Sequence, residues 1–433
     1  MLTIDYILDY TRTRKILAKD ISSLLYYILM TVEKIPILQV AYKSEWALAK
    51  FFQALKEGEI PEKFILKTIC GREDTKELAY KALKKAVMDR VKYLEDGGCR
   101  SGNRTKEIDS ILELMEGFFS NGIKYLKTNR NKTLVEEAYE GIEGVIIHSK
   151  NTTHRGYIKQ AFDKGKHIIC EKPLVTVLDE WGNADERDLK FLEDIVNSNN
   201  GLVLMDAEHY SYKKPSIIFY EKLEEILSGS RIRGIEGYIN EIDDPNFGRT
   251  KDVLNLENRT GILTDTVIHL LAFISNLGGK AVPTSARYGI YKGYDVETGV
   301  KAEYNIEGNS KYFMEGAKAS FQAMKFIDKQ IKPENQETKL IKFSLEDDSE
   351  IIINFRDGTL KKSKGGVEQD IKFRFDINKN EYVNILNFFN EAVGNHTKPR
   401  TDFRNSAVTL RSIYETYRDF PIQENKWEVY RCE

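Results

Sequence analysis

The segment GKHIICEKPL, residues 165–174, carries the pattern that decides the fold. Its apolar run HIIC has the length of one buried strand, and the charged pair Glu171 and Lys172 with Pro173 suits the turn that follows a strand. Further strand and helix patterns alternate around it, over residues 144–148, 153–164, 186–198 and 201–205. Strands that alternate with helices predict a doubly wound parallel sheet.

The same alternation reaches toward the N-terminus. IPILQVA (35–41) and FILKTIC (64–70) read as strands, and residues 45–57 between them have helical spacing. We therefore predict a Rossmann-type dinucleotide-binding domain over residues 35–210, with a helical insertion over 75–119. Residues 1–34 are predicted to form an N-terminal helical extension.

The pattern changes after Tyr212. Long alternating segments follow over 287–294, 318–328 and 338–356, the last broken by a turn at 347–349. A helix is expected to end at Gly394, and another is expected over 405–417. These features predict an α+β domain over residues 211–433 with a large, mainly antiparallel sheet. The cleft between the two domains is the expected site.

Composition excludes several classes of function. The 65 Lys plus Arg and 67 Asp plus Glu leave a net charge of -2, which creates no field for a polyanion such as nucleic acid. The four cysteines are far apart and form no C-x-x-C pair, so neither a disulfide framework nor a metal site is expected. The apolar run 21–32 is too short to span a bilayer. We expect a cytoplasmic protein with no metal, nucleic-acid or membrane partner.

Three residues are the catalytic candidates. Lys172 follows the predicted strand at the edge where parallel sheets bind ligands, where it could polarise a hydroxyl or carbonyl group. Asp265 and His269 are four residues apart, so on a helix they would face the same way and could together bind a hydroxyl and remove its proton. The competing interpretation is a solvated lysine and a helix-capping or core Asp and His.

A further group of candidates follows the last strand of the first domain. Glu208, His209, Tyr210 and Lys213 combine charges with an aromatic hydroxyl and could hold an anionic substrate group. A charged, solvated domain junction explains the same residues equally well.

These segments in this order resemble the glucose-fructose oxidoreductase and inositol dehydrogenase (Gfo/Idh/MocA) family. The resemblance is carried by GVIIHSKNTTH (144–154), by E-K-P at 171–173 and by D-x-x-x-H at 265–269. It implies an NAD(P)-dependent oxidoreductase acting on a sugar or sugar phosphate, with the nicotinamide near Asn151, His154 and Glu171. It also implies catalysis by Lys172 and His269, a hydroxyl held by Asp265, and a homodimer or homotetramer.

A second resemblance is local. EHYSYK (208–213) is similar to the D-H-Y-x-G-K motif of glucose-6-phosphate dehydrogenase. That resemblance implies phosphate binding by His209, Tyr210 and Lys213, and it makes Glu208 a candidate to orient His269.

The first predicted strand-to-helix turn departs from the family pattern. Residues 41–47 read AYKSEWA and lack the glycines that normally let the backbone approach a pyrophosphate. Ala41, Lys43 and Ser44 remain the cofactor-binding candidates there, and Arg72 after the second strand favours NADP over NAD. The missing glycines leave two alternatives open: a member that has lost the dinucleotide and serves as a sugar sensor or complex subunit, and a cofactor-retaining epimerase or lyase.

Overall fold

The structure is a computed structural model that describes residues 134–199, 201–241, 253–325, 338–371 and 381–426. It also describes Glu77 and three strands nearer the N-terminus, over residues 35–40, 64–71 and 124–127. Apart from Glu77, the predicted helices over 1–34, 45–57 and 75–119 lie outside the described residues.

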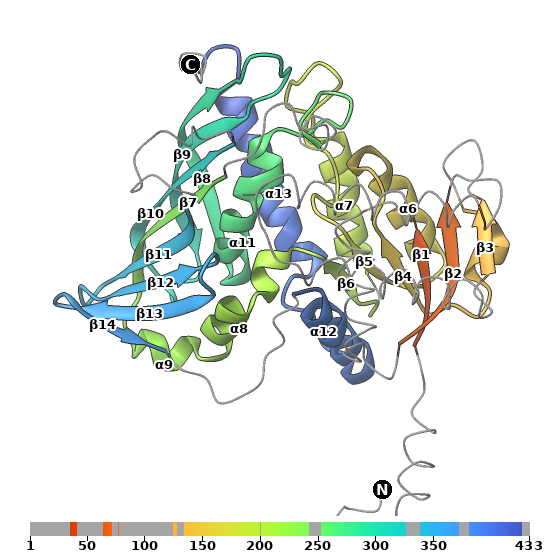
Figure 1. Cartoon of the computed structure of the whole chain (residues 1–433), viewed down its shortest axis with the longest axis horizontal. Helices are drawn as coiled ribbons and strands as arrows, with labels where there is room; N and C mark the ends of the chain where they lie inside the picture. Colours follow the sequence, from red (N-terminus) through yellow and green to blue (C-terminus); the bar gives the residue numbers. More distant parts are fainter. Residues whose placement is uncertain are drawn as a thin grey trace, which may run out of the picture.

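The first sheet is parallel throughout and has six strands in the order β3-β2-β1-β4-β5-β6 (Figure 1). Its strands are β1 (Ile35–Val40), β2 (Phe64–Gly71), β3 (Lys124–Lys127), β4 (Gly144–Ile147), β5 (His167–Cys170) and β6 (Leu204–Asp206). The strand order reverses between β1 and β4, which is the point where such sheets bind their ligands. The predicted Rossmann-type sheet is confirmed.

Within the described residues, two helices pack beside this sheet. They are α6 (Asn151–Asp163) and α7 (Arg187–Ser198). The helix α6 connects β4 to β5 and α7 connects β5 to β6, as crossover helices do between parallel strands. A short 3-10 helix, η1 (Glu136–Tyr139), precedes β4. Apolar residues such as Ile158, Leu189 and Leu192 face inward and are fully buried, so the amphipathic spacing in the sequence accounts for the packing.

The second sheet has eight strands in the order β14-β13-β12-β11-β7-β10-β9-β8. They are β7 (Ile232–Asn240), β8 (Gly279–Gly289), β9 (Gly299–Gly308), β10 (Phe313–Met324), β11 (Lys339–Leu345), β12 (Glu350–Asn354), β13 (Thr359–Lys364) and β14 (Val367–Asp370). Every pair is antiparallel except β7 with β10. Inward and outward residues alternate along β9 and β10, as expected for a sheet with one covered face.

Two predicted elements of this domain differ from the structure. The strand expected over 287–294 ends at Gly289 and begins earlier, at Gly279, because Pro283 lies on an edge strand that tolerates a proline at a bulge. The helix α12 (Glu381–Asn395) continues through Gly394, and the left-handed position after it belongs to His396, with φ of 51°.

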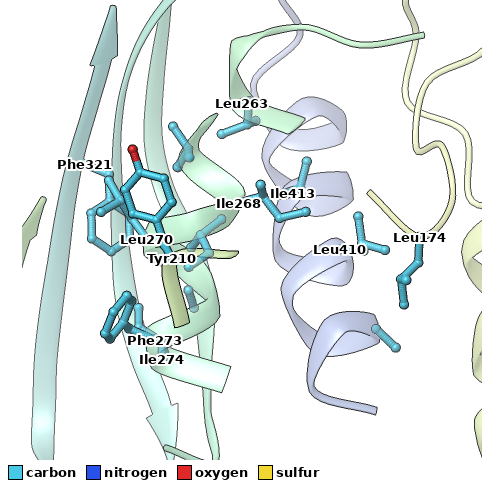
Figure 2. Close-up of a cluster of buried hydrophobic side chains, with 14 of the residues drawn as sticks. Leu174, Tyr210, Leu263, Ile268, Leu270, Phe273, Ile274, Phe321, Leu410 and Ile413 are labelled. Carbon is cyan, nitrogen blue, oxygen red and sulfur yellow. The ribbon is translucent and has the colours of Figure 1, made fainter. Parts of the chain in front are cut away.

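The helix α11 (Ile268–Asn276) lies between the second sheet and α13 (Phe403–Asp419). Figure 2 shows Ile268 and Phe273 of α11 with Phe321 of β10 on one side and Ile413 of α13 on the other. These side chains are almost fully buried and belong to one continuous core. The helix that carries His269 is therefore held by packing on two sides.

The helix α13 joins the two halves of the molecule. It packs against α11 and β8 on one side and against α7 on the other (Figure 1). Arg411 of α13 binds both carboxylate oxygens of Glu193 on α7 at 2.7 Å, and Ser406 donates to Asp206 at the end of β6. The C-terminal helices thus fix the second sheet to the carboxyl edge of the first. None of the helices in the described ranges has the length and apolar character needed to cross a membrane.

Candidate active site

Lys172 and Asp265 meet across the junction of the two halves. Lys172 lies two residues after β5, and Asp265 lies in η3 (Leu263–Val267), a π-helical turn that leads into α11. The Lys172 Nζ donates to the Asp265 Oδ1 at 2.7 Å and to the Asp265 main-chain oxygen at 2.5 Å. The two side chains are 12% and 20% exposed, so they can still be reached from solvent.

Asp265 is held as a carboxylate. Burial opposes its ionisation, but the ammonium groups of Lys172 and Lys325 outweigh burial and lower its pKa. The Lys325 Nζ lies 3.8 Å from the second carboxylate oxygen of Asp265 and also pairs with Glu241 at the end of β7. A line of alternating charges therefore runs from Lys172 into the second sheet.

His269 and Glu208 form a second contact between distant segments. His269 lies in the first turn of α11, and its Nδ1 is hydrogen-bonded to the Glu208 Oε1. Glu208 caps η2 (His209–Tyr212), where its carboxylate accepts hydrogen bonds from the backbone N–H groups of Tyr210 at 3.0 Å and Ser211 at 2.9 Å. Burial raises the pKa of Glu208, and these donors act against that shift.

His269 is placed to exchange a proton with a ligand. Burial and the neighbouring Lys172 ammonium lower its pKa well below 6.5, so the imidazole is neutral near pH 7. With Nδ1 hydrogen-bonded to Glu208, Nε2 is the ring nitrogen left to meet a ligand. Tyr210 stacks on the ring at 4.3 Å between centroids and His209 meets its edge at 4.5 Å, which fixes the imidazole plane.

The helical spacing behind Asp265 and His269 is only partly regular. The sequence predicts one α-helix that presents both side chains together, whereas Asp265 belongs to the π-helical turn and His269 to α11. The carboxylate and the imidazole accordingly take different partners, Lys172 and Glu208. A substrate hydroxyl that binds Asp265, as expected from the sequence, would therefore share its carboxylate with Lys172.

The other substrate-binding candidates surround His269. Tyr210 is buried, as Figure 2 shows, within the cluster that includes Phe321, and burial raises the pKa of its phenol. The Lys213 ammonium lies over the Tyr210 ring, 4.5 Å from its centroid. Among the residues that the structure describes, one group has ligand atoms close enough for a metal ion: Glu208, His209 and His269. Lys172 and Lys213 act electrostatically on His269, and such cations disfavour a metal ion there.

The predicted cofactor-binding residues are placed in three ways. Asn151 begins α6, and its Nδ2 donates to the Thr260 hydroxyl at 2.7 Å. His154 is fully buried, and its ring nitrogens lie 2.9 Å and 2.8 Å from the main-chain oxygens of Ser149 and Pro173, so it ties together the loops after β4 and β5. Ala41, Lys43, Ser44 and Arg72 lie outside the described residues.

Glu171 provides a test of the nicotinamide site. Its Oε1 is buried without a hydrogen-bond partner in the described parts of the chain. The His148 Nε2 is 3.9 Å away, and burial lowers the pKa of that imidazole to about 3, so it offers no charge. Burial raises the pKa of Glu171 to about 7 against the pull of Lys172. An unpartnered carboxyl group at the carboxyl edge of β5 suits a ligand amide or hydroxyl, so this part of the edge fits a nicotinamide.

Sequence reasoning missed three charged residues next to the candidates. Lys325 follows β10, Glu241 follows β7 and Lys339 begins β11, and Lys339 pairs with Glu241 at 2.8 Å. All three lie at the ends of strands of the second sheet, and Lys325 connects them to Asp265. The available signal was their position at the ends of alternating segments, which reveals nothing until the strand order is known.

The described residues also enclose a cavity of about 250 Å³ at another place between the two halves. Its lining includes Leu178, Trp181, Val296, Tyr417 and Ile422. None of the catalytic or substrate-binding candidates lines it. This cavity is therefore not the expected catalytic site, which lies where Lys172, Asp265 and His269 are placed.

Comparison with known families agrees with the sequence pattern. A family model described as an oxidoreductase family with an NAD-binding Rossmann fold, GFO_IDH_MocA, matches residues 117–187. This region includes E-K-P at 171–173, and the resemblance to the Gfo/Idh/MocA family is confirmed. The family description also agrees with the predicted nicotinamide cofactor.

One curated relative matches over a short region. Glucose-6-phosphate 3-dehydrogenase of Bacillus subtilis (strain 168) is 37% identical over 62 residues. The match covers 14% of this chain and 18% of the relative's length.

Solved structures match over nearly the whole chain at low identity. Levoglucosan dehydrogenase in complex with NADH and levoglucosan gives a TM-score of 0.63 at 17% identity, covering 89% of this chain and 98% of that one. KijD10, a 3-ketoreductase from Actinomadura kijaniata in complex with NADP, gives 0.59 at 13% identity, covering 92% and 100%. UDP-N-acetylglucosamine 3-dehydrogenase GnnA from Acidithiobacillus ferrooxidans gives 0.58 at 14%, covering 90% and 99%. The predicted two-part fold is confirmed by these matches.

Proposed function

We propose that this chain, as a relative of the Gfo/Idh/MocA family, is an NAD(P)-dependent dehydrogenase or reductase that acts on a hydroxyl or carbonyl group of a sugar or sugar phosphate. The observation that carries the proposal is the contact of Lys172, from the end of β5, with Asp265 in the turn that leads into α11, the helix that carries His269 in its first turn. When bound at this edge, the nicotinamide supplies or accepts the hydride.

His269 moves the proton. Its Nδ1–H donates to Glu208, and its Nε2 takes the proton of the substrate hydroxyl during oxidation or returns it during reduction. The lowered pKa of His269 keeps the imidazole neutral and ready to accept. Glu208 fixes the tautomer and stabilises the imidazolium that forms, as a buried carboxylate does in an acid-base dyad.

Lys172 polarises the reacting oxygen. Two of its three N–H groups donate to the main-chain oxygen and the Oδ1 of Asp265, and the third can donate to a substrate oxygen. Asp265 then orients Lys172 as well as meeting a neighbouring substrate hydroxyl. The opposite division, in which Lys172 exchanges the proton and His269 polarises the oxygen, uses the same contacts.

Glu171 and Asn151 would hold the nicotinamide end of the cofactor. Both follow strands of the first sheet at its carboxyl edge, and Glu171 has the unpartnered oxygen described above. Ala41, Lys43 and Ser44 for the pyrophosphate, and Arg72 for a 2′-phosphate, stay predictions.

Two relatives bear on the substrate. The Bacillus subtilis relative is named for a sugar phosphate, whereas levoglucosan dehydrogenase is named for an uncharged sugar. The Lys213 ammonium, over the Tyr210 ring that stacks on His269, favours an anionic sugar for this chain. Burial lowers the pKa of His209 well below 6.5, so that imidazole adds a hydrogen-bonding group but no charge.

The proposal is tested with the purified protein and a panel of sugars, sugar phosphates and nucleotide sugars. We expect reduction of NAD or NADP, followed by absorbance at the nicotinamide band, with at least one of them. The missing glycines at 41–47 favour a second candidate, a sugar-binding sensor, for which calorimetry would detect a sugar ligand but neither nucleotide. A cofactor released on denaturation together with isomerised or dehydrated product would identify the non-redox alternative. Either result would contradict the dehydrogenase.

We also propose a cytoplasmic homodimer or homotetramer. The low cysteine content supports a reducing compartment, and the family resemblance supports association. Light scattering on the eluting protein distinguishes these states from a monomer.

A further inference from the structure

A buried carboxyl group outside the candidate active site touches the turn that carries Asp265. Glu297 lies just before β9 and has no exposed surface. Its Oε1 accepts hydrogen bonds from the Leu263 N–H, at 3.3 Å, and from the Tyr417 hydroxyl of α13. Its main-chain oxygen accepts from the Ile262 N–H at 3.0 Å.

Gly261 leaves the space that this carboxyl group occupies. A Cβ atom at Gly261 would lie 2.0 Å from the Glu297 Oε1, far inside contact distance. The main-chain oxygen of Gly261 in turn accepts from the Asp265 N–H at 2.9 Å. Glu297 is therefore one peptide group away from the backbone that positions Asp265.

The cost of burying Glu297 argues for a specific role. Its second oxygen, Oε2, has no hydrogen-bond partner among the described residues, although the group is fully buried. An apolar side chain of similar volume would fill the same space without that desolvation cost. An apolar side chain cannot accept hydrogen bonds from the Leu263 N–H and the Tyr417 hydroxyl, and these two bonds connect η3 to α13.

We propose that Glu297 is a positioning residue: its carboxyl group holds the turn at Gly261 to Leu263 and thereby sets where Asp265 and His269 stand relative to Lys172. The inference rests on the proposed function insofar as Asp265 and His269 act on substrate. The placement itself can be measured without any substrate.

The test compares substitutions that separate packing from hydrogen bonding. Glu297→Gln keeps an acceptor oxygen, and Glu297→Met keeps the volume but removes the acceptor. We expect Glu297→Gln to keep kcat within several-fold and Glu297→Met to lower it about 10-fold or more, with the Kd for the nucleotide changed less than twofold. Tyr304→Phe, which removes another buried hydroxyl next to α13, is the matched control and should leave kcat unchanged.

Gly261→Ala provides the reciprocal variant. Alone, it should displace the turn and lower kcat at least as much as Glu297→Met does. Combined with Glu297→Ala, which removes the clashing carboxyl group, it should recover part of that loss, so the two effects should be strongly non-additive. Additive losses in the double variant would overturn the proposal.

A readout without substrate keeps the test independent of the proposed reaction. The imidazole NMR signals of His269, assigned by their loss in His269→Gln, should shift in Glu297→Met and Gly261→Ala but not in Glu297→Gln or Tyr304→Phe. Shifted signals in a protein that oxidises no sugar would retain the positioning role and reject only the dehydrogenase. Unmoved signals and unchanged kcat in folded Glu297→Met would reject the positioning role.

Discussion

The Lys172 Nζ lies 2.7 Å from the Asp265 Oδ1, and this contact joins the carboxyl end of a parallel strand to the turn that begins α11. Neither half of the molecule contains the candidate site alone. The first sheet supplies the lysine and the cofactor edge, while the second part supplies the acid and the imidazole. Because α13 packs against both α7 and α11, the relative position of the two halves is fixed by the core rather than by the ion pair.

Removal of Lys172 or His269 should abolish most turnover. We expect Lys172→Ala and His269→Ala each to lower kcat by about 100-fold or more, in the range typical of positioned acid-base groups. Steady-state rates with the identified substrate measure this, with Lys159→Ala on the exposed side of α6 as the control. Wild-type rates in both variants would remove these residues from the chemistry.

Glu208 should act through His269. Glu208→Gln can still accept from the Nδ1–H but cannot stabilise an imidazolium by charge, so we expect kcat to fall about 10-fold to 100-fold with a small change in KM. Glu208→Ala should lower kcat further, because it leaves the Nδ1–H without its acceptor. It also removes the cap of η2 and should therefore lower thermal stability. The exposed Glu143→Gln is the control. An unchanged kcat in a folded Glu208→Ala protein would show that the dyad has no part in catalysis.

Lys213 should discriminate substrates by charge. Its ammonium lies over Tyr210, which stacks on His269, so it is close to the expected position of the substrate. We expect Lys213→Ala to raise KM for a phosphorylated or other anionic sugar by about tenfold, equivalent to about 1.4 kcal/mol. A neutral sugar measured in parallel should change much less. Equal changes in KM for both substrates, or a preference of the wild type for neutral sugars, would show that residues 208–213 form a charged domain junction and do not bind an anionic substrate group.

Arg72 should discriminate between the two nucleotides. A guanidinium at the end of the second strand can pair with the 2′-phosphate that only NADP carries. We expect Arg72→Ala to weaken NADP much more than NAD in calorimetric titrations. Equal weakening of both, or of neither, would place this side chain away from the ribose.

The sequence is sufficient for the parts of the site that depend on local spacing. E-K-P lies next to its strand and D-x-x-x-H within one helical segment, so Lys172, Asp265 and His269 could be singled out before any contact was known. The similarity to the glucose-6-phosphate dehydrogenase motif also predicted Glu208 as the partner of His269, and the structure places them in contact. The parallel direction of the strands in the first sheet followed from the alternation of strands and helices.

The remaining parts depend on contacts between distant segments. Glu241 pairs with Lys325, which lies near Asp265, because β7 and β10 are neighbours, and the β7–β10 pair is the parallel one in an otherwise antiparallel sheet. The π-helical turn at Asp265 has the same apolar pattern as an α-helix, so spacing cannot distinguish them. Glu297 is a charged residue in a strand-like segment, and its burial follows from the absence of a side chain at Gly261.

The buried Glu297 should also make stability depend on pH. Burial raises its pKa to about 7 from an ordinary value of 4.5, so between these values the folded protein keeps a proton that the unfolded chain has released. Folding then binds a proton, and stability falls as pH rises through this window, by up to about 1.4 kcal/mol for each pH unit. Glu297→Gln cannot release that proton and should not show this loss. Relative to the wild type, the variant should therefore gain stability from pH 5 to pH 7 and change little above pH 7. The contribution of Glu171 is common to both proteins and cancels.

Urea unfolding at several pH values measures the difference in stability between the two proteins. Glu257→Gln, at a side chain that is 82% exposed, is the control for the substitution itself. A difference between Glu297→Gln and wild type that stays constant from pH 5 to pH 8 would show that Glu297 ionises in the folded protein as it does in the unfolded chain.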